Sequence, residues 1–490
     1  MLGSYVFTDP KGELYDKTAG YLKRNGYEIK VLNLVNPKFS DGYNPLMHIS
    51  SELDVDVIAN TIVKGQKTSS GNSDPYWDDM SEMLLKSLIY YLIATRPEEE
   101  QNLASCAELV RAANANGGGN LLTDLISQLP YDHPARMYYK SIEIAPDKTY
   151  SSILSSLQSK LGKFDSKEIA ELTSTDTISF EEIGSKRTAV YVISSDTHTA
   201  YDFLLTIFFS QMIQQLYNYA DKSPNGELPM PVYFILDEFA NIGRVPDFDK
   251  KISTSRSRKL SFSVILQNLD QLEAVYEKSY ETIIGNCDTH VFLGSNSQKT
   301  VEYFSKAMGE KTISKEQLSK SRDKHNMWTQ GYNSSDQVMA RALMTPDELR
   351  RMDNDLCIIF EKGLKPIKAT KYYYFKKPKV SNALQEYRIS HNEFQGVERG
   401  IWRKFNPNNP YVPGDERDKN EKLDIGSLDD LFLEDEEDKK EELDSFMLPQ
   451  EEEPIEKTEQ KTNQEEEFDI QKELEAKFDE LFGSVDEDED

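Results

Sequence analysis

The sequence predicts an α/β protein whose parallel sheet is interrupted by an all-α insertion and followed by a disordered acidic tail. Three observations indicate this class. Strand and helix patterns alternate at the start of the chain, helical patterns alone fill a long middle stretch, and acidic residues dominate the C-terminal end. Alternating strands and helices are the building units of parallel sheets.

The first unit is a strand, a helix and a second strand. Residues 4–8 read as a strand, and the sequence Asp-Pro-Lys-Gly at 9–12 is a turn signal. Residues 13–25 then have helical periodicity that closes at Gly26, and residues 27–34 alternate as a strand does. This order is the building block of a parallel α/β sheet.

The pattern becomes entirely helical after about residue 71, and its first long amphipathic stretch is at 77–94. Strand patterns return at 189–193 and recur at 232–236, 261–266, 289–293, 356–360 and 371–375. The predicted organisation is an α/β segment at 1–70, an all-α insertion at 71–180, a second α/β segment at 181–375, an extended linker at 376–413 and a disordered acidic tail at 414–490.

The charge of the chain is concentrated in its tail. The formal net charge is -28, and residues 414–490 hold 33 Asp and Glu against 9 Lys and Arg. The remaining body has 52 acidic and 48 basic residues, so nucleic-acid binding would need a local basic surface. The tail is too poor in aliphatic residues to fold alone. It is expected to bind a protein partner, the other interpretation being a solvated extension that limits aggregation.

Cysteine and hydropathy patterns exclude several classes. The three cysteines are isolated, which argues against a disulfide framework and fits a reducing cytosol. The histidines have no metal-ligand spacing, so no metal is expected beyond one that accompanies a nucleotide. No stretch approaches the roughly 20 apolar residues of a membrane span, and Met1 leads directly into a strand pattern rather than a signal peptide.

The strand pattern at 232–236 leads into two carboxylates, Asp237 and Glu238. In P-loop nucleoside-triphosphatases, such a buried strand brings an Asp to Mg²⁺ and a Glu to the attacking water. The sequence nowhere contains Gly-x-x-x-x-Gly-Lys-Ser/Thr, the loop that cradles the phosphates. The pattern therefore predicts half of an ATPase site, unless Asp237 simply caps the next helix.

A second polar strand end supports this interpretation. The next strand pattern runs into Gln267, where an amide can sense a γ-phosphate, although Gln also occurs at solvated strand ends. Arg256, Arg258 and Lys259 lie between the two strands. Guanidinium groups stabilise charge on a transferred phosphoryl group. The other interpretations of this segment are a solvated basic turn and a contact with DNA phosphates.

The ordered motifs resemble one known family. The sequence Ser-Tyr-Val-Phe-Thr-Asp-Pro-Lys-Gly-Glu-Leu at 4–14 is similar to the segment after the first P-loop helix of type IV coupling proteins. These are TraG/TraD-type ATPases of conjugative DNA transfer and type IV secretion. The other matching segments are Asn-Pro-Leu at 44–46, the helix that begins at Trp77, Leu-Asp-Glu-Phe-Ala-Asn-Ile-Gly at 236–243, Ser-Arg-Ser-Arg at 255–258, Leu-Gln-Asn at 266–268, Asn-Cys at 286–287 and Val-Phe-Leu-Gly at 291–294.

The resemblance covers about 1–375 and implies a RecA-like nucleotide-binding domain that is interrupted by the all-α domain. It implies a hexameric ring at the cytoplasmic face of the bacterial membrane. That ring would recruit a complex of relaxase and single-stranded DNA, contact type IV secretion channel proteins, and use ATP with Mg²⁺ to drive transfer.

The resemblance also implies roles for individual residues. Asp237 would hold Mg²⁺ through water, Glu238 would be the catalytic carboxylate, and Gln267 would sense the γ-phosphate. Arg256 would act on the nucleotide of a neighbouring subunit. Candidates for lining the nucleotide or the subunit interface are Asp9, Lys11 and Glu13, and candidates for DNA binding are Arg256, Arg258 and Lys259.

The sequence departs from the family pattern at its start, where the membrane helices and the first strand, P-loop and helix are missing. We expect an N-terminal truncation, arising from a misplaced start, an interrupted gene or a genuine shorter partner. The alternative function is a catalytically inactive receptor or adaptor that binds secretion substrates through the helical domain and acidic tail. A helicase-like or chromosome-segregation pump is a further alternative, because such enzymes share the acidic strand.

Overall fold

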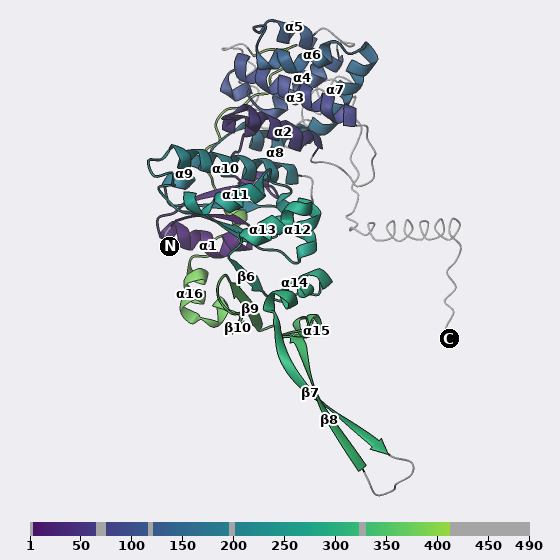
Figure 1. Ribbon diagram of the computed structural model, residues 1–490. Helices are drawn as coiled ribbons and strands as arrows, with labels where there is room; N and C mark the ends of the chain where they lie inside the picture. Colours follow the sequence, from purple (N-terminus) through teal and green to yellow (C-terminus); the bar gives the residue numbers. More distant parts are fainter. Residues whose placement is uncertain (1–2, 65–74, 116–120, 196–200, 323–329, 412–490) are drawn as a thin grey trace, which may run out of the picture. The chain divides into compact units, whose positions relative to one another are not determined.

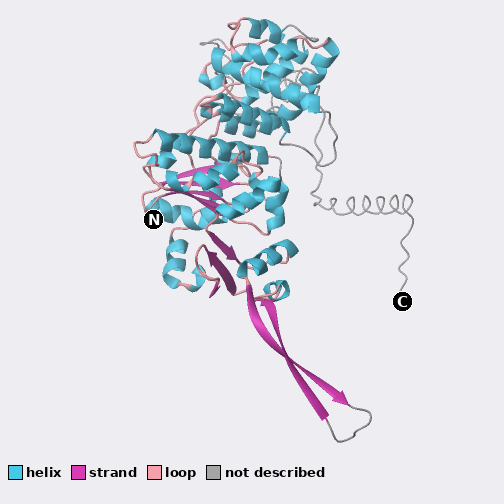
Figure 2. Cartoon of the chain, viewed as in Figure 1, coloured by secondary structure: helices cyan, strands magenta, loops and turns pink. Residues whose placement is uncertain are grey.

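The computed structural model describes residues 3–64, 75–115, 121–195, 201–322 and 330–411. The predicted acidic tail therefore lies outside the described residues. Residues up to Tyr411 form one compact unit. The unit contains a parallel sheet, a helical region and a smaller antiparallel sheet (Figures 1 and 2).

The parallel sheet has five strands in the order β2-β3-β1-β4-β5. These strands are β1 (Ser4–Thr8), β2 (Glu28–Asn33), β3 (Thr188–Ile193), β4 (Val232–Leu236) and β5 (Leu260–Val264). All neighbouring pairs are parallel, and β1 lies between β3 and β4. The predicted parallel sheet is confirmed, with β3 inserted between the two strands of the first unit.

Helices cover both faces of this sheet. Helix α1 (Glu13–Arg24) packs Tyr15, Ala19 and Leu22 against β2 and β3 on one face. The opposite face is covered chiefly by α10 (Asp202–Lys222), in a core that also holds Val6 of β1 and Phe234 of β4. Successive strand residues point to opposite faces. The apolar strand patterns therefore bury side chains in both layers, as expected for a parallel sheet.

The crossover from β2 to β3 contains the helical region, in which Figure 2 shows no strands among the drawn elements. The helix α2 (Glu52–Lys64) precedes it, and its main helix is α3 (Pro75–Thr95). The remaining helices are α4 (Leu103–Ala115), α5 (Leu121–Ser127), α6 (Pro134–Glu143), α7 (Asp147–Leu161), α8 (Lys167–Ser174) and α9 (Phe180–Ser185). Their buried residues join the α10 face of the sheet in one continuous core.

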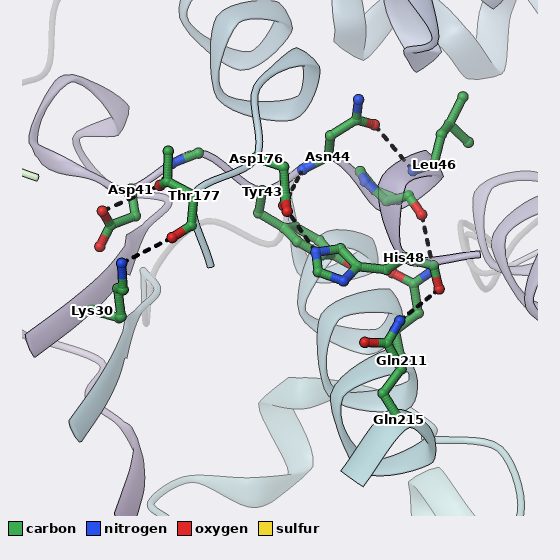
Figure 3. Close-up of polar contacts among 12 residues, drawn as sticks. Lys30, Asp41, Tyr43, Asn44, Leu46, His48, Asp176, Thr177, Gln211 and Gln215 are labelled. Atoms are coloured by element: carbon green, nitrogen blue, oxygen red, sulfur yellow. Dashed lines mark hydrogen bonds and ion pairs between the residues drawn. The ribbon is translucent and has the colours of Figure 1, made fainter. Parts of the chain in front are cut away.

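A group of polar contacts, here called the polar seam, connects the segment that leaves the sheet after β2 with the segment that returns to it before β3 (Figure 3). It consists of Tyr43, Asn44, His48, Asp176 and Gln211. The Asp176 carboxylate accepts hydrogen bonds from the backbone of Asn44 at 3.3 Å and from the His48 ring at 2.9 Å. The hydroxyl of fully buried Tyr43 donates to Gln211 Oε1 of α10 at 2.5 Å. The Asn44 side chain caps the following short helix, so the Asn-Pro-Leu segment has a structural role here.

A smaller sheet follows the parallel one in sequence. Its antiparallel strands lie in the order β10-β9-β6, with β6 (Thr289–Phe292), β9 (Leu356–Glu361) and β10 (Ile367–Thr370). It is reached through α11 (Phe248–Thr254), α12 (Leu269–Tyr276) and α13 (Tyr280–Asn286), and it packs on α14 (Gln298–Met308) and α15 (Pro346–Arg350). The predicted strand at 289–293 thus pairs with β9 rather than with the parallel strands.

Two segments fold differently from what their apolar alternation indicates. Residues 314–322 and 330–340, which show no apolar alternation, lie in the paired strands β7 (Glu310–Arg322) and β8 (Gln330–Ala342). A two-stranded ribbon can form through its backbone pairing without burying one face, so hydrophobic alternation did not reveal it. The predicted strand at 371–375 is wrong, because the strand β10 ends at Thr370 and a 3₁₀ turn follows at Tyr374–Lys376.

The segment after residue 376 is more structured than the extended linker that the sequence predicts. It forms α16 (Pro378–Glu386) and then returns along the body of the protein. The Ile389 N–H donates to the Asp16 carbonyl at 3.2 Å, and the Arg403 N–H donates to the Glu99 carbonyl at 2.8 Å. Phe405 is buried against the helical region. The segment after α16 therefore contacts both α1 and the helical region.

The Tyr43→Phe substitution should destabilise the protein, because it leaves the buried Gln211 oxygen without its hydroxyl donor. We expect the free energy of unfolding to fall by about 1–3 kcal/mol. Urea unfolding followed by circular dichroism measures this change. The same substitution at the exposed Tyr131 is the matched control, and equal losses at both positions would contradict the seam's role.

Candidate functional site

The first wall of the site is the turn that follows β1. The Asp9 N–H continues the strand pairing by donating to the Val192 carbonyl at 2.9 Å. The Asp9 carboxylate then accepts the Tyr15 N–H at 2.8 Å, which turns the chain into α1. Gly12 stands at the start of that helix with a φ of 71°, and a Cβ there would overlap the His391 ring. Asp9 is therefore held nearly buried at the carboxyl edge of the sheet.

The second wall is the end of β4. The Thr8 hydroxyl of the neighbouring strand donates to the Asp237 carbonyl at 2.6 Å, which fastens the two strand ends together. Glu238 follows in the left-handed region, with φ 50° and ψ 47°. This conformation is uncommon for a residue with a Cβ and recurs at functional sites.

The third wall comes from the loop after β5. The Ile265 N–H donates to the Leu236 carbonyl at 3.0 Å, and the Phe239 N–H donates to the Ile265 carbonyl at 3.1 Å. This pairing carries the loop alongside the end of β4. The Gln267 side-chain amide then donates to Glu238 Oε1 at 2.8 Å. The parallel register thus brings together two predicted site residues that are 29 positions apart.

These walls enclose a cavity of about 590 Å³. It is lined by Asp9, Pro10, Lys11, Glu13, Leu14, Lys17, Asp237, Glu238, Asn241, Gln267 and Gln271. The structure thus brings six predicted site residues into one cavity. Sequence reasoning missed Lys17, Asn241 and Gln271. Helical spacing from Glu13 signals Lys17, and the two are paired at 2.8 Å.

Burial and like charge perturb the carboxyl groups of the cavity. Burial raises the pKa of Asp9, and hydrogen bonds from backbone N–H groups, foremost that of Tyr15, oppose the shift. Burial also raises the pKa of Asp237, and the neighbouring Glu238 carboxylate raises it further. A cation bound between these two carboxylates and a ligand would therefore lower both pKa values and stabilise the ionised forms. Perturbed acids in a cavity are typical of functional sites.

The predicted basic residues lie elsewhere. Arg256 precedes β5 whereas Gln267 follows it, so the strand separates them by roughly 17 Å at 3.3 Å per residue. Arg258 donates to both carboxylate oxygens of Asp221, at 2.8 and 3.2 Å, and Lys259 pairs with Glu227 at 2.7 Å. Arg256 is exposed and has no ion-pair partner among the described residues. Within one chain, these three residues do not reach the cavity.

The cavity fits the metal side of a nucleotide site better than the phosphate side. Carboxylate and amide oxygens are the donors that Mg²⁺ prefers. The buried Gln271 Oε1 has no hydrogen-bond partner and is available to a ligand or water. Within the described ranges, no group of three His, Cys, Asp or Glu side chains is arranged to hold a metal alone. A bound Mg²⁺ would therefore need water and ligand oxygens to complete its shell.

In α/β proteins with a parallel sheet, ligands bind at the carboxyl ends of the strands, which is where this polar cavity lies. Comparison with family models narrows this class. The model described as "Type IV secretory system Conjugative DNA transfer" matches residues 1–397. The chain belongs to this family, as the motifs at 4–14 and 236–243 predict.

Individual relatives agree with this assignment. The chain is 25% identical to protein VirD4 of Agrobacterium fabrum over 392 residues, which covers 76% of the chain and 55% of the relative. It is 23% identical over 440 residues to the conjugal transfer protein TraG of Escherichia coli, covering 80% of the chain and 68% of the relative. The chain spans about half the length of the VirD4 relatives it matches.

Solved structures of a bacterial conjugative coupling protein, TrwB, share the fold. A sulphate complex of TrwB lacking its N-terminal segment gives a TM-score of 0.51 at 16% identity, covering 76% of this chain and 80% of that one. A complex of TrwB with ADP and Mg²⁺ gives 0.50 at 17% identity, covering 77% and 80%. In the parts of the chain that the structure describes, no helix has the length and apolar character of a membrane span.

The Asp237→Asn substitution should stabilise the protein at neutral pH. Folding raises the pKa of this carboxyl group. The folded protein therefore loses stability when the pH rises above the ordinary pKa of 3.8 and the group ionises. The substitution removes that loss, so its benefit should grow as pH rises from about 3.8 to 7 and vanish at lower pH. We expect no more than about 1 kcal/mol, because the group is partly exposed.

Urea unfolding midpoints across this pH range measure the effect. The control is Asp132→Asn at an exposed position of the helical region. A benefit of the Asp237 substitution that is independent of pH would show that charge is not its cause.

Proposed function

We propose that this chain acts as a coupling protein of a conjugative type IV secretion system. It recruits a complex of relaxase and single-stranded DNA and drives its transfer by ATP hydrolysis in a hexameric ring. The observation that carries this proposal is the pairing of Gln267 with Glu238 beside Asp237, at the carboxyl edge of a RecA-like sheet. The family match supports the DNA-transfer role.

Each residue has a distinct part in the proposed reaction. Asp237 binds Mg²⁺ through water, and its raised pKa falls when the cation is present. Glu238 orients the attacking water and accepts its proton. Gln267 holds Glu238 before the nucleotide arrives, and a γ-phosphate would compete for its amide. ATP would supply the reacting phosphoryl group, and Mg²⁺ would neutralise its charge.

The phosphate cradle of the proposed site comes from outside these 490 residues, because their sequence has no Gly-x-x-x-x-Gly-Lys-Ser/Thr loop. Among the described residues, β5 pairs with β4 alone and β6 pairs with β9 alone. Ile265 beside β5 and Val291 and Leu293 of the β6 segment are exposed apolar residues. These strands offer unpaired edges to a further strand that carries the loop.

Arg256 completes the site of the next subunit in this proposal. It lies at the amino end of β5, away from its own cavity, and a head-to-tail ring would place it against a neighbouring nucleotide. The ring works at the cytoplasmic face of the membrane, together with the secretion channel proteins. Arg256, Arg258 and Lys259 are the candidate residues for contact with DNA phosphates.

The Glu238→Gln substitution should lower the conjugation frequency about 100-fold or more, because an amide cannot accept the proton of the attacking water. Donor cells that carry the conjugative element measure this frequency. Binding of a fluorescent ATP analogue to the purified assembly should remain. Normal transfer by this variant would exclude Glu238 as the catalytic carboxylate.

The Arg256→Ala substitution should reduce transfer by about 1,000-fold if Arg256 acts as a trans arginine. Arg258→Ala is the matched control, because its guanidinium is already held by Asp221 and should matter much less. Comparable losses for both variants would favour contact with DNA phosphates over a catalytic role.

The missing phosphate loop favours a second candidate function, a catalytically inactive receptor for secretion substrates. This receptor would use the helical region and the acidic tail. Steady ATP hydrolysis by the purified chain, abolished by Glu238→Gln, would exclude it. Loss of substrate binding after deletion of 414–490 would support it.

A further inference from the structure

A lysine-rich, aromatic segment at 362–379 stands apart from the rest of this acidic protein. It contains seven lysines and no Asp or Glu, in a chain whose net charge is -28. It runs from the end of β9 through β10 to the start of α16 (Figure 1). Nearly all of its residues are exposed. We call this segment the lysine–aromatic surface.

Most of its positive charge is uncompensated. Lys362 lies 3.7 Å from the Asp288 carboxylate, and the Lys376 ammonium lies 4.2 Å from the centre of the Tyr373 ring. The other five lysines form no ion pair with a described residue; they are Lys365, Lys368, Lys371, Lys377 and Lys379. The neighbouring Asp355 carboxylate accepts the Tyr373 hydroxyl at 2.8 Å. A concentration of free charge of this kind fits a polyanionic partner.

The same surface exposes large apolar side chains. Leu364 is 59% exposed, Ile367 47%, Tyr372 68% and Phe375 58%. Leu364 and Ile367 flank the turn that joins β9 to β10, and β10 is the outermost strand of its sheet. Apolar side chains interleaved with lysines mark an interaction surface rather than a solvated charged face.

We propose that the lysine–aromatic surface binds an anionic lipid bilayer peripherally. The lysines contact lipid phosphates, while Leu364, Ile367, Tyr372 and Phe375 enter the boundary between headgroups and acyl chains. Lysine and aromatic side chains favour this boundary, because their apolar parts are buried and their polar ends stay hydrated. The contact needs no spanning helix and is independent of the proposed ATPase.

Single-stranded nucleic acid fits the surface less well. Its bases stack on free aromatic faces. Here the Tyr373 ring already packs against Phe375, with ring centres 5.3 Å apart, and Lys376 covers it as well, so among the described residues of this surface Tyr372 is the ring without a ring contact. Leu364 and Ile367 offer no stacking face, whereas a lipid boundary accepts aliphatic side chains. The exposed aliphatic residues therefore decide in favour of lipid.

Co-sedimentation of the full chain with vesicles tests this proposal. The protein should bind to vesicles of mixed phosphatidylcholine and phosphatidylglycerol. It should bind much more weakly to vesicles of phosphatidylcholine alone. Removing three lysine charges should weaken this binding about 100-fold. The variant carries Lys368→Gln, Lys377→Gln and Lys379→Gln, and its matched control carries Lys148→Gln, Lys167→Gln and Lys278→Gln at exposed positions elsewhere.

A second variant tests the apolar part of the surface. Leu364→Ser combined with Phe375→Ser should weaken vesicle binding about 10-fold or more without changing the net charge. All substituted side chains are exposed, so thermal unfolding of each variant should match that of the wild type.

Two results would overturn the proposal. The first is vesicle binding that is absent in the wild type, or equal in the lysine variant and its control. The second is that the wild type binds a fluorescent poly-dT oligonucleotide, that the lysine variant loses this binding, and that vesicles do not compete for it. That result would assign the surface to nucleic acid. Neither result depends on ATP hydrolysis or on conjugation, so the coupling function is tested separately.

Discussion

The parallel pairing of β1 with both β3 and β4 organises the sheet and the cavity at its edge. It makes β1 the central strand and places the turn at Asp9 beside the carboxyl end of β4. The hydrogen bond from Thr8 to the Asp237 carbonyl fixes that junction at 2.6 Å. The cavity exists because the ends of parallel strands meet at one edge of the sheet. Polar residues from distant segments thereby share one space.

The same constraint explains the long excursion between β2 and β3. The chain leaves the sheet after β2, builds the helical region and must return to a strand position between β2 and β1. The polar seam joins the two ends of this excursion to each other through Asn44 and Asp176, and Tyr43 bonds the outgoing end to Gln211 of α10. Because one core continues from the sheet into the helices, the insertion is coupled to the sheet.

Much of the candidate site could be predicted from sequence, because its residues follow recognisable strand patterns. Asp237 and Glu238 follow β4 directly, Asp9 follows β1 directly, and Gln267 lies three residues after the end of β5. Asn241 and Gln271 gave no comparable signal, since they enter the cavity from a 3₁₀ turn and a helix, whereas Lys17 is marked only by its helical spacing from Glu13. The hairpin of β7 and β8 was missed because paired polar strands need no apolar face.

Local sequence patterns located most of the strands and helices, because apolar periodicity and helix caps act between near neighbours; the capping box at Thr345 formed as its residues indicate, whereas the hairpin of β7 and β8 had no such pattern. Strand order could not be read from local patterns, because it depends on pairing between distant segments. That order joined Gln267 to Glu238, separated Arg256 from its own cavity, and placed β6 in the smaller sheet. It also left most of the lysines and aromatic rings at 362–379 in solvent, because among the described residues no strand pairs with the outer edge of β10.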